Sequence, residues 1–103
     1  MFKKFFFLSA LLSATSANAY HVVTPTGAGC DTEDGTCYIL IKETLSDTNC
    51  QASNQVRLNP NKPGSEGQYS AGLAAFMAGK RLVVEIKGCH QNHPAPAYLY
   101  VTD

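Results

Sequence analysis

Two histidines near the end of the chain have a spacing that could bind a transition metal. His90 and His93 lie in the segment CHQNHPAP, an H-x-x-H arrangement directly after Cys89. Imidazole is a common ligand of zinc and copper, but two histidines supply only half of a usual coordination set and the segment contains no carboxylate. Metal handling is therefore an alternative to an ordinary surface loop, and we expect no cofactor.

The same histidines could serve a hydrolytic reaction. His21 together with His90 or His93 could act as acid and base, while Lys80 or Arg81 held a phosphate group. Nothing in the sequence places these side chains at one site. We therefore expect a protein that is not an enzyme, with a small metal-handling or hydrolytic protein as the alternative.

Acidic residues gather in the loop GCDTEDGTC. Asp31, Glu33 and Asp34 precede Gly35, and carboxylate oxygens are the ligands that calcium prefers. The spacing does not match an EF-hand, and a short loop between two cysteines leaves little room for enough ligands. We expect a solvated acidic turn here.

Two tyrosines alternate with apolar residues in the last segment, AYLYVT. If Leu99 and Val101 face the core, Tyr98 and Tyr100 form an outward aromatic stripe. Such a stripe suits sugar stacking or a subunit interface, and the alternative is that a neighbouring loop covers it. The candidate binding residues predicted from the sequence are Tyr98, Tyr100, His90 and His93.

Four cysteines form an even set in a small chain. The set consists of Cys30, Cys37, Cys50 and Cys89, which predicts two disulfides and allows three pairings. We favour Cys30 with Cys37, which closes the hydrophilic loop, and Cys50 with Cys89, which ties the middle of the chain to its end. A zinc site is less favoured, because six residues separate the first pair where a shorter spacing is usual.

The first 19 residues have the features of a bacterial export signal. Lys3 and Lys4 precede an apolar run from Phe5 to Ala14, and an A-x-A pattern ends at Ala19. The run is about half the length that a membrane span needs. We expect cleavage after Ala19, with an uncleaved anchor as the alternative, and delivery to the periplasm or outside the cell with no remaining membrane span.

Removing 19 of the 103 residues leaves 84, which is enough for one domain, residues 20–103. This part carries six basic and eight acidic residues, a formal charge of −2. A protein that binds nucleic acid non-specifically needs a basic patch, so nucleic acid is excluded as a partner. A chain of this length buries only about 60–65% of its unfolded surface, so the disulfides must add stability.

Strand-like segments alternate with turn residues along most of the domain. Pro25, Gly27 and Gly29 interrupt the pattern after the first strand, and a long loop runs from Pro60 to Gly67. Both faces of the second strand are partly apolar, so we expect it to lie centrally in its sheet. The predicted strands are Tyr20–Thr24, Thr36–Glu43, Gln55–Asn59, Leu82–Lys87 and Ala97–Thr102.

One segment has a helical period instead. Tyr69, Leu73, Phe76 and Met77 share one stripe of a helix that Gly79 ends, and this stripe should dock on the sheet. Five strands with a helix between the third and fourth is the order of an OB-fold. The predicted fold class is mainly β, a small five-stranded Greek-key barrel with one helix and two disulfides.

The segment LAAFMAGKRLVVEIKGCHQN, from Leu73 to Asn92, together with Cys50 and the final tyrosine-bearing strand, resembles a group of small exported bacterial proteins. That group is similar to the OB-fold B subunits of pertussis-type and subtilase-type toxins. The resemblance implies an OB-fold, the Cys50–Cys89 pairing, assembly into pentamers and binding of cell-surface glycans. It carries over no sugar-binding residue, since none matches, and the chain has no tryptophan.

These observations predict an exported binding module whose partner is a glycan, a peptide or a protein subunit. We expect binding through the Tyr98 and Tyr100 face, or through the loops around Pro60–Gly67 and His90–Pro96. Self-association into a homo-oligomer is part of the prediction.

Overall fold

The computed structural model describes residues 20–103, so the predicted signal peptide and its cleavage point lie outside the described residues. The elements follow one another as six strands with one helix between the fourth and fifth strands. They are β1 (Tyr20–Val23), β2 (Pro25–Cys30), β3 (Cys37–Ile41), β4 (Gln55–Leu58), α1 (Ser65–Ala78), β5 (Arg81–His90) and β6 (His93–Thr102). None of the described helices is long and apolar enough to cross a membrane.

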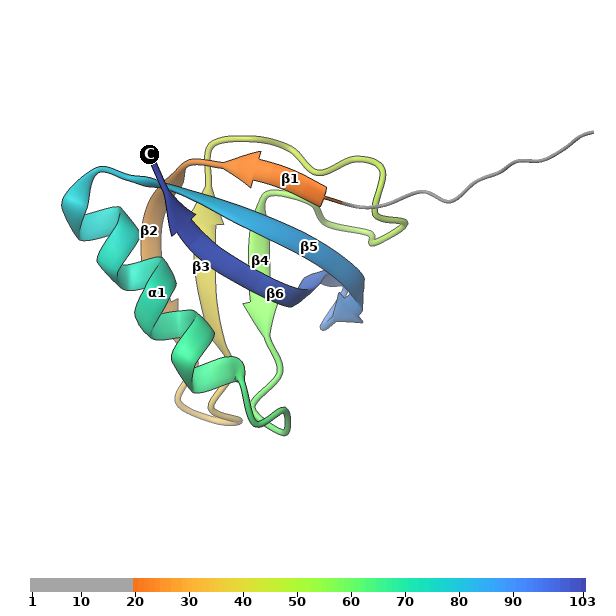
Figure 1. Cartoon of the computed structure of the whole chain (residues 1–103). Coiled ribbons are helices and arrows are strands. Elements are labelled where there is room, and N and C mark those ends of the chain that lie inside the picture. Colours follow the sequence, from red (N-terminus) through yellow and green to blue (C-terminus); the bar gives the residue numbers. More distant parts are fainter. Residues whose placement is uncertain (1–19) are drawn as a thin grey trace, which may run out of the picture.

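The strands form two antiparallel sheets of three strands each. One sheet has the order β1-β5-β6 and the other β2-β3-β4, and in Figure 1 the strands of the two sheets run in different directions. The central place predicted for the second strand is confirmed by β3. The fold is mainly β, with the predicted single helix.

The sequence predicted five strands, and the sixth is β2. Its Pro25 begins the strand, where the missing N–H is tolerated. Its glycines make room for the neighbouring strand: a Cβ on Gly27 would lie 3.1 Å from Leu40 Cδ1, and one on Gly29 would lie 2.9 Å from the Tyr38 hydroxyl. The sequence predicted that these glycines interrupt the strand pattern. In the structure they lie within β2 and leave space for the large side chains of the neighbouring strand.

The two sheets do not close into a barrel. β4 packs beside β6, but among the described residues no ladder joins them, and the sheets remain separate. The predicted five-stranded Greek-key barrel is therefore not confirmed. The polypeptide passes from one sheet to the other through Thr24, which separates β1 from β2.

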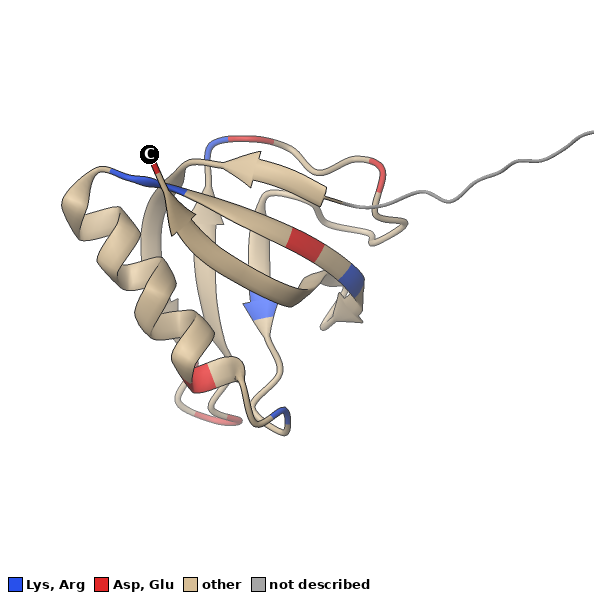
Figure 2. Ribbon diagram, in the orientation of Figure 1, with Lys and Arg blue, Asp and Glu red and all other residues tan. Residues whose placement is uncertain are grey.

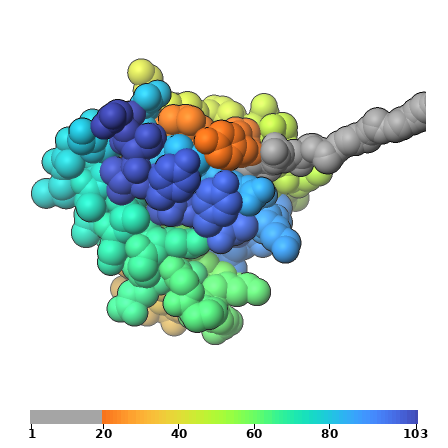
Figure 3. Space-filling view, viewed as in Figure 1, coloured from red at the N-terminus to blue at the C-terminus, as the bar shows by residue number. Residues whose placement is uncertain are grey.

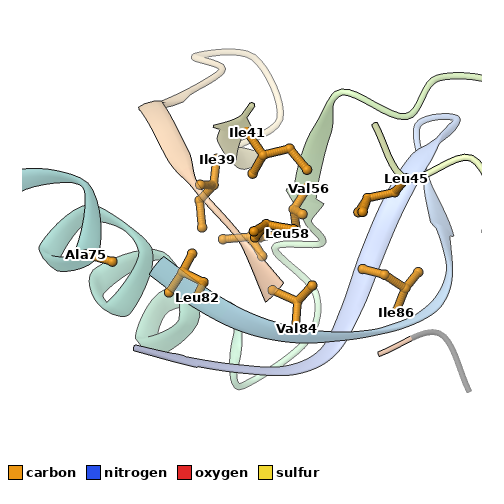
Figure 4. Close-up of a cluster of buried hydrophobic side chains, with 10 residues drawn as sticks. Ile39, Ile41, Leu45, Val56, Leu58, Ala75, Leu82, Val84 and Ile86 are labelled. Carbon is orange, nitrogen blue, oxygen red and sulfur yellow. The ribbon is translucent and has the colours of Figure 1, made fainter. Parts of the chain in front are cut away.

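The core lies between the two sheets. Figure 4 shows Ile39, Ile41, Val56 and Leu58 from the β2-β3-β4 sheet facing Leu82, Val84 and Ile86 from β5, with Leu45 of a loop at one end. Ala75 of α1 covers the other end. Strand alternation explains this arrangement, since every second residue of β3, β4 and β5 points inward.

The helix packs through its small residues, and the predicted apolar stripe is wrong. Its buried residues are Ser65, Gly72 and Ala75, whereas Leu73 and Phe76 are each 38% exposed and Met77 is 75% exposed. The small side chains allow the helix to approach the sheet so closely that a Cβ on Gly72 would lie 2.0 Å from Ile39 Cδ1. Among the described residues, Tyr69 is the one member of the predicted stripe that packs against the hydrophobic core.

The bounds of the helix are partly as predicted. It starts at Ser65, inside the expected loop, rather than at Tyr69. Gly79 ends it, as predicted, and has the left-handed conformation with φ 68°.

The expected loop His90–Pro96 is shorter in the structure, because β5 runs to His90 and β6 begins at His93.

Both predicted disulfides are confirmed. Cys30 is bonded to Cys37, across the β2–β3 hairpin, and Cys50 is bonded to Cys89, between the loop after β3 and the end of β5. No free cysteine remains among residues 20–103. The second bond fixes the long segment between β3 and β4 to the β5–β6 hairpin.

Glu43 holds the junction between the two sheets and should make stability sensitive to acid. Its two carboxylate oxygens accept the Thr24 N–H at 2.7 Å and the Thr24 hydroxyl at 2.8 Å. Desolvation raises the pKa of Glu43, but these two hydrogen bonds outweigh it and hold the pKa below its ordinary 4.5. The stabilisation is thus present above pH 4.5 and is lost as pH falls through the lower, folded-state pKa.

We expect Glu43→Gln to lower the free energy of unfolding at pH 7 by about 1 kcal/mol, a figure reduced for solvent screening. The variant should also lose less stability than the wild type between pH 6 and pH 3 in urea titrations followed by circular dichroism. Glu33→Gln, at an exposed turn position, is the control. Equal acid sensitivity of the Glu43 variant and the wild type would contradict this role.

Candidate functional site

The outer face of the β1-β5-β6 sheet carries a group of exposed tyrosines. Register places Tyr20 opposite Glu85, and Glu85 opposite Tyr98. The next outward row joins Val22, Val83 and Tyr100 in the same way. Because directly opposed residues point to the same side of an antiparallel sheet, the three tyrosines share one face, which we call the tyrosine surface.

The predicted outward orientation of Tyr98 and Tyr100 is confirmed. Tyr98 is 42% exposed and Tyr100 is 49% exposed, while Leu99 between them packs against the core. Val101 does not share the burial of Leu99, since it is 41% exposed. No described loop therefore hides the two rings from solvent.

The rings are held in a defined arrangement. Tyr98 and Tyr100 lie nearly parallel, with ring centroids 6.2 Å apart and an interplanar angle of 17°. Interaction with the neighbouring Tyr20 side chain raises the pKa of Tyr100 above its ordinary value of 10.0. In Figure 3 the β1 atoms (orange) and β6 atoms (dark blue) form one continuous patch.

The tyrosine surface is mainly uncharged. β6 contains no Lys, Arg, Asp or Glu, and Figure 2 shows most charges on loops and strand ends away from it. The carboxylate in the two outward rows is that of Glu85, which is partly buried between Tyr20 and Tyr98. Val83 is 4% exposed although it points outward, which indicates that its neighbours cover it.

Tyr20 is the member of this surface that sequence reasoning missed. The segment YHVVT predicted a strand, but a strand alone does not reveal its partners. The pairing of β1 with β5 brings residue 20 beside residues 98 and 100. In the sequence, strand alternation places Tyr20 and Val22 on one face and Val23 on the other. This pattern predicts the face of the sheet on which Tyr20 lies, but it does not show which residues of other strands lie beside it.

His90 and His93 are brought together at the end of the β5–β6 hairpin, where they form the last pair before the turn. Each imidazole ring lies within hydrogen-bond distance of another group of the domain. His90 Nε2 lies 3.0 Å from the Thr36 hydroxyl, and His93 Nδ1 lies 2.8 Å from the Gln91 carbonyl. Residues 20–103 contain no group of three or more His, Cys, Asp or Glu that could hold a metal ion.

The remaining residues of the acid and base alternative lie apart. His21 pairs with Val84, and the span of β5 from there to His90 is roughly 20 Å. The His21 Nε2 atom is buried 3.2 Å from an Asp47 oxygen, in a geometry that is not a hydrogen bond. Lys80 and Arg81 contact Asp103 instead, at 3.4 Å and 2.7 Å.

The carboxylates of the acidic loop form hydrogen bonds with other residues of the same domain. Asp31 accepts a hydrogen bond from Arg57 at 2.9 Å, and Asp34 accepts one from the Thr36 N–H at 3.0 Å. That backbone hydrogen bond is the main cause that lowers the pKa of Asp34. Gln91 bonds to both Arg57 and Asp34, so the loop is tied to the tip of the β5–β6 hairpin.

The two predicted binding loops meet at a cleft. Residues of the 59–68 segment and of the 87–97 hairpin line a cavity of ≈ 550 Å³. A second cleft of ≈ 530 Å³ adjoins it, since Lys62 and Ser65 line both, and continues to Gly35 and Tyr69. The sequence had named both loops without placing them side by side.

The comparisons with known proteins name no relative that could assign the tyrosine surface or the clefts. No protein-family model, no curated protein and no solved structure matches this chain.

Proposed function

We propose that this protein is an exported, non-catalytic binding module that holds a glycan on its tyrosine surface. The observation that carries the proposal is the grouping of three exposed tyrosines on one open sheet face, two of them stacked on each other. Aromatic side chains of this kind offer an apolar ring face together with a polar hydroxyl. A sugar ring has the matching character, with C–H groups on its faces and hydroxyls around its rim.

The arrangement supports a sugar better than a purely apolar partner. Three phenol hydroxyls and the Glu85 carboxylate lie within the same two outward rows as the rings. Sugar hydroxyls can donate to the carboxylate and exchange hydrogen bonds with the phenols. Tyrosines also lose little conformational entropy on binding, because each has few rotatable bonds.

The proposal extends to architecture and location. If β1 and β2 count as one bent strand, the element order β-β-β-α-β-β is that of the OB-fold, a fold used for oligosaccharide binding. Two disulfides in a small domain favour an oxidising compartment, in line with the predicted export signal. The similarity to toxin B subunits remains a prediction.

A glycan array followed by isothermal titration with the best ligand tests the proposal. We expect Tyr98→Ala/Tyr100→Ala to weaken binding on the order of thirtyfold, as loss of a central aromatic pair does at other interfaces. Leu73→Ala/Met77→Ala, which removes two exposed apolar side chains from α1, is the matched control and should bind normally.

Two results would contradict the glycan assignment. One is an array without any ligand above background. The other is a change in molar mass by light scattering, in which the wild type is an oligomer and the tyrosine variant a monomer. The second result would make the tyrosine surface a contact between copies of this chain.

A further inference from the structure

The ≈ 550 Å³ cleft lies between the start of α1 and the β5–β6 hairpin. One wall carries Lys62, Ser65 and Gln68, and the other carries Lys87, His90 and Pro96. Its volume is within the range of sites for small molecules. None of the three tyrosines of the tyrosine surface lines it, so it is a separate place on the molecule.

The charge of the cleft is of one sign. Both walls contribute a lysine, and no Asp or Glu is among the lining residues. Within residues 20–103 neither lysine takes part in an ion pair; the pairs there are His21–Asp47, Arg57–Asp31 and Lys80–Asp103. Glu66 faces the adjoining cleft instead. Two ammonium groups thus remain available to an anionic ligand in a chain whose net charge is not basic.

The walls of the cleft are fixed by bonds that do not involve the lysines. The Cys50–Cys89 disulfide anchors the hairpin wall, and the Ser65 hydroxyl donates to the Asn59 carbonyl at 2.6 Å in the opposite wall. The Gln68 side-chain amide donates to the Ala97 carbonyl at 3.4 Å and joins the two walls. Because its walls are already fixed, this cleft should lose little conformational entropy when a ligand binds.

We propose that this cleft binds a small molecule that carries a phosphate monoester, with the phosphate held by Lys62 and Lys87. A phosphate monoester is largely a dianion at neutral pH, because its second pKa is about 6. Lysine binds phosphate as a mobile point charge and needs no planar, two-pronged geometry. His90, whose ring lies 3.0 Å from the Thr36 hydroxyl, and Gln68 line the same cleft and add polar contacts for the rest of the ligand.

Isothermal titration and amide chemical-shift mapping test the site with inorganic phosphate and glucose 6-phosphate, at low salt, beside glucose. We expect both phosphates to shift the resonances of Gln68 and Gly88, and glucose 6-phosphate to bind at least about tenfold more tightly than glucose. Vesicles with and without phosphatidic acid form a further arm. Binding to those vesicles but not to glucose 6-phosphate would keep the phosphate site and make a lipid headgroup its source.

Lys62→Gln/Lys87→Gln should weaken phosphate binding about tenfold or more. The matched control is Lys42→Gln/Lys80→Gln, which removes the same charge from positions outside the cleft and should change affinity less than about twofold. Tyr98→Ala/Tyr100→Ala should leave phosphate binding unchanged, which separates this site from the proposed glycan surface. The proposal is overturned if no phosphate probe binds, if glucose binds as well as its phosphate, or if both lysine pairs lose affinity equally.

Discussion

Cys50→Ser/Cys89→Ser should lower the free energy of unfolding by about 4 kcal/mol, the largest single loss that we expect in this domain. The bond joins residues 39 positions apart, so it removes a large closed loop from the freedom of the unfolded chain. A domain of this size has a total stability of about 4–12 kcal/mol. The variant should therefore lose a third or more of the total stability.

The control for this prediction is the other disulfide. Cys30 and Cys37 are only 7 positions apart, and the same reasoning gives a loss of about 2.5 kcal/mol for Cys30→Ser/Cys37→Ser. Urea and thermal unfolding followed by circular dichroism measure both losses, and the long-range pair should lower Tm by about 15 °C or more. Equal losses for the two pairs, or the reverse order, would contradict the role given to the long-range bond.

Gly72→Ala should destabilise the protein by about 2 kcal/mol, although alanine is the better helix former. The new Cβ would lie 2.0 Å from Ile39 Cδ1 and 2.8 Å from Cγ1. Ile39 is completely buried in the centre of the core, so its side chain has no free space to enter. The helix must move away from the β2-β3-β4 sheet or Ile39 must leave its rotamer.

Gly67→Ala is the matched control in the same helix. No heavy atom lies within 4 Å of a Cβ at Gly67, so this change should stabilise by about 0.5–1 kcal/mol. Ile39→Val, which lacks the Cδ1 atom, should partly rescue Gly72→Ala, with a coupling of at least about 0.5 kcal/mol in a double-mutant cycle of urea unfolding. A stabilising Gly72→Ala would show that the helix does not seat against Ile39.

Local patterns predicted most of the strands because the alternation of apolar residues is itself the cause of their burial. The buried residues of β3 and β4 stand at alternate positions, as strand alternation requires. In β5 the alternation is less complete, because the outward Val83 is buried together with Leu82 and Val84. The same logic misjudged β2, since glycines at alternate positions carry no apolar signal. Their use becomes visible only when Leu40 and Tyr38 lie opposite them.

The helix shows where a periodic pattern gives the wrong face. Large apolar residues at helical spacing predicted a docking stripe, yet Gly72 and Ala75 make the contact with the core. The sheet beneath is already filled by Ile39, so close approach of the backbone stabilises more than insertion of Phe76 or Leu73 would. Period alone cannot report how much space a sheet leaves above it.

The candidate sites, too, were predicted from the sequence only in part. The sequence identified Tyr98 and Tyr100 as outward, and it named both loops that line the cleft. It could not join Tyr20 to the tyrosine surface, because that contact depends on the pairing of β1 with β5. It also could not bring Lys62 and Lys87 to opposite walls of one cavity, since 25 positions of chain, including a helix, separate them.

The sequence by itself determined the mainly β class, the two disulfides, the end of the helix at Gly79 and the outward tyrosines, since each depends on residues close together or on a cysteine count of four. Tertiary structure alone decided the open pair of sheets, the face on which α1 packs and the neighbours of each surface residue. These features depend on strand register and on the volume left between layers, which are properties of distant segments in contact and not of any local pattern.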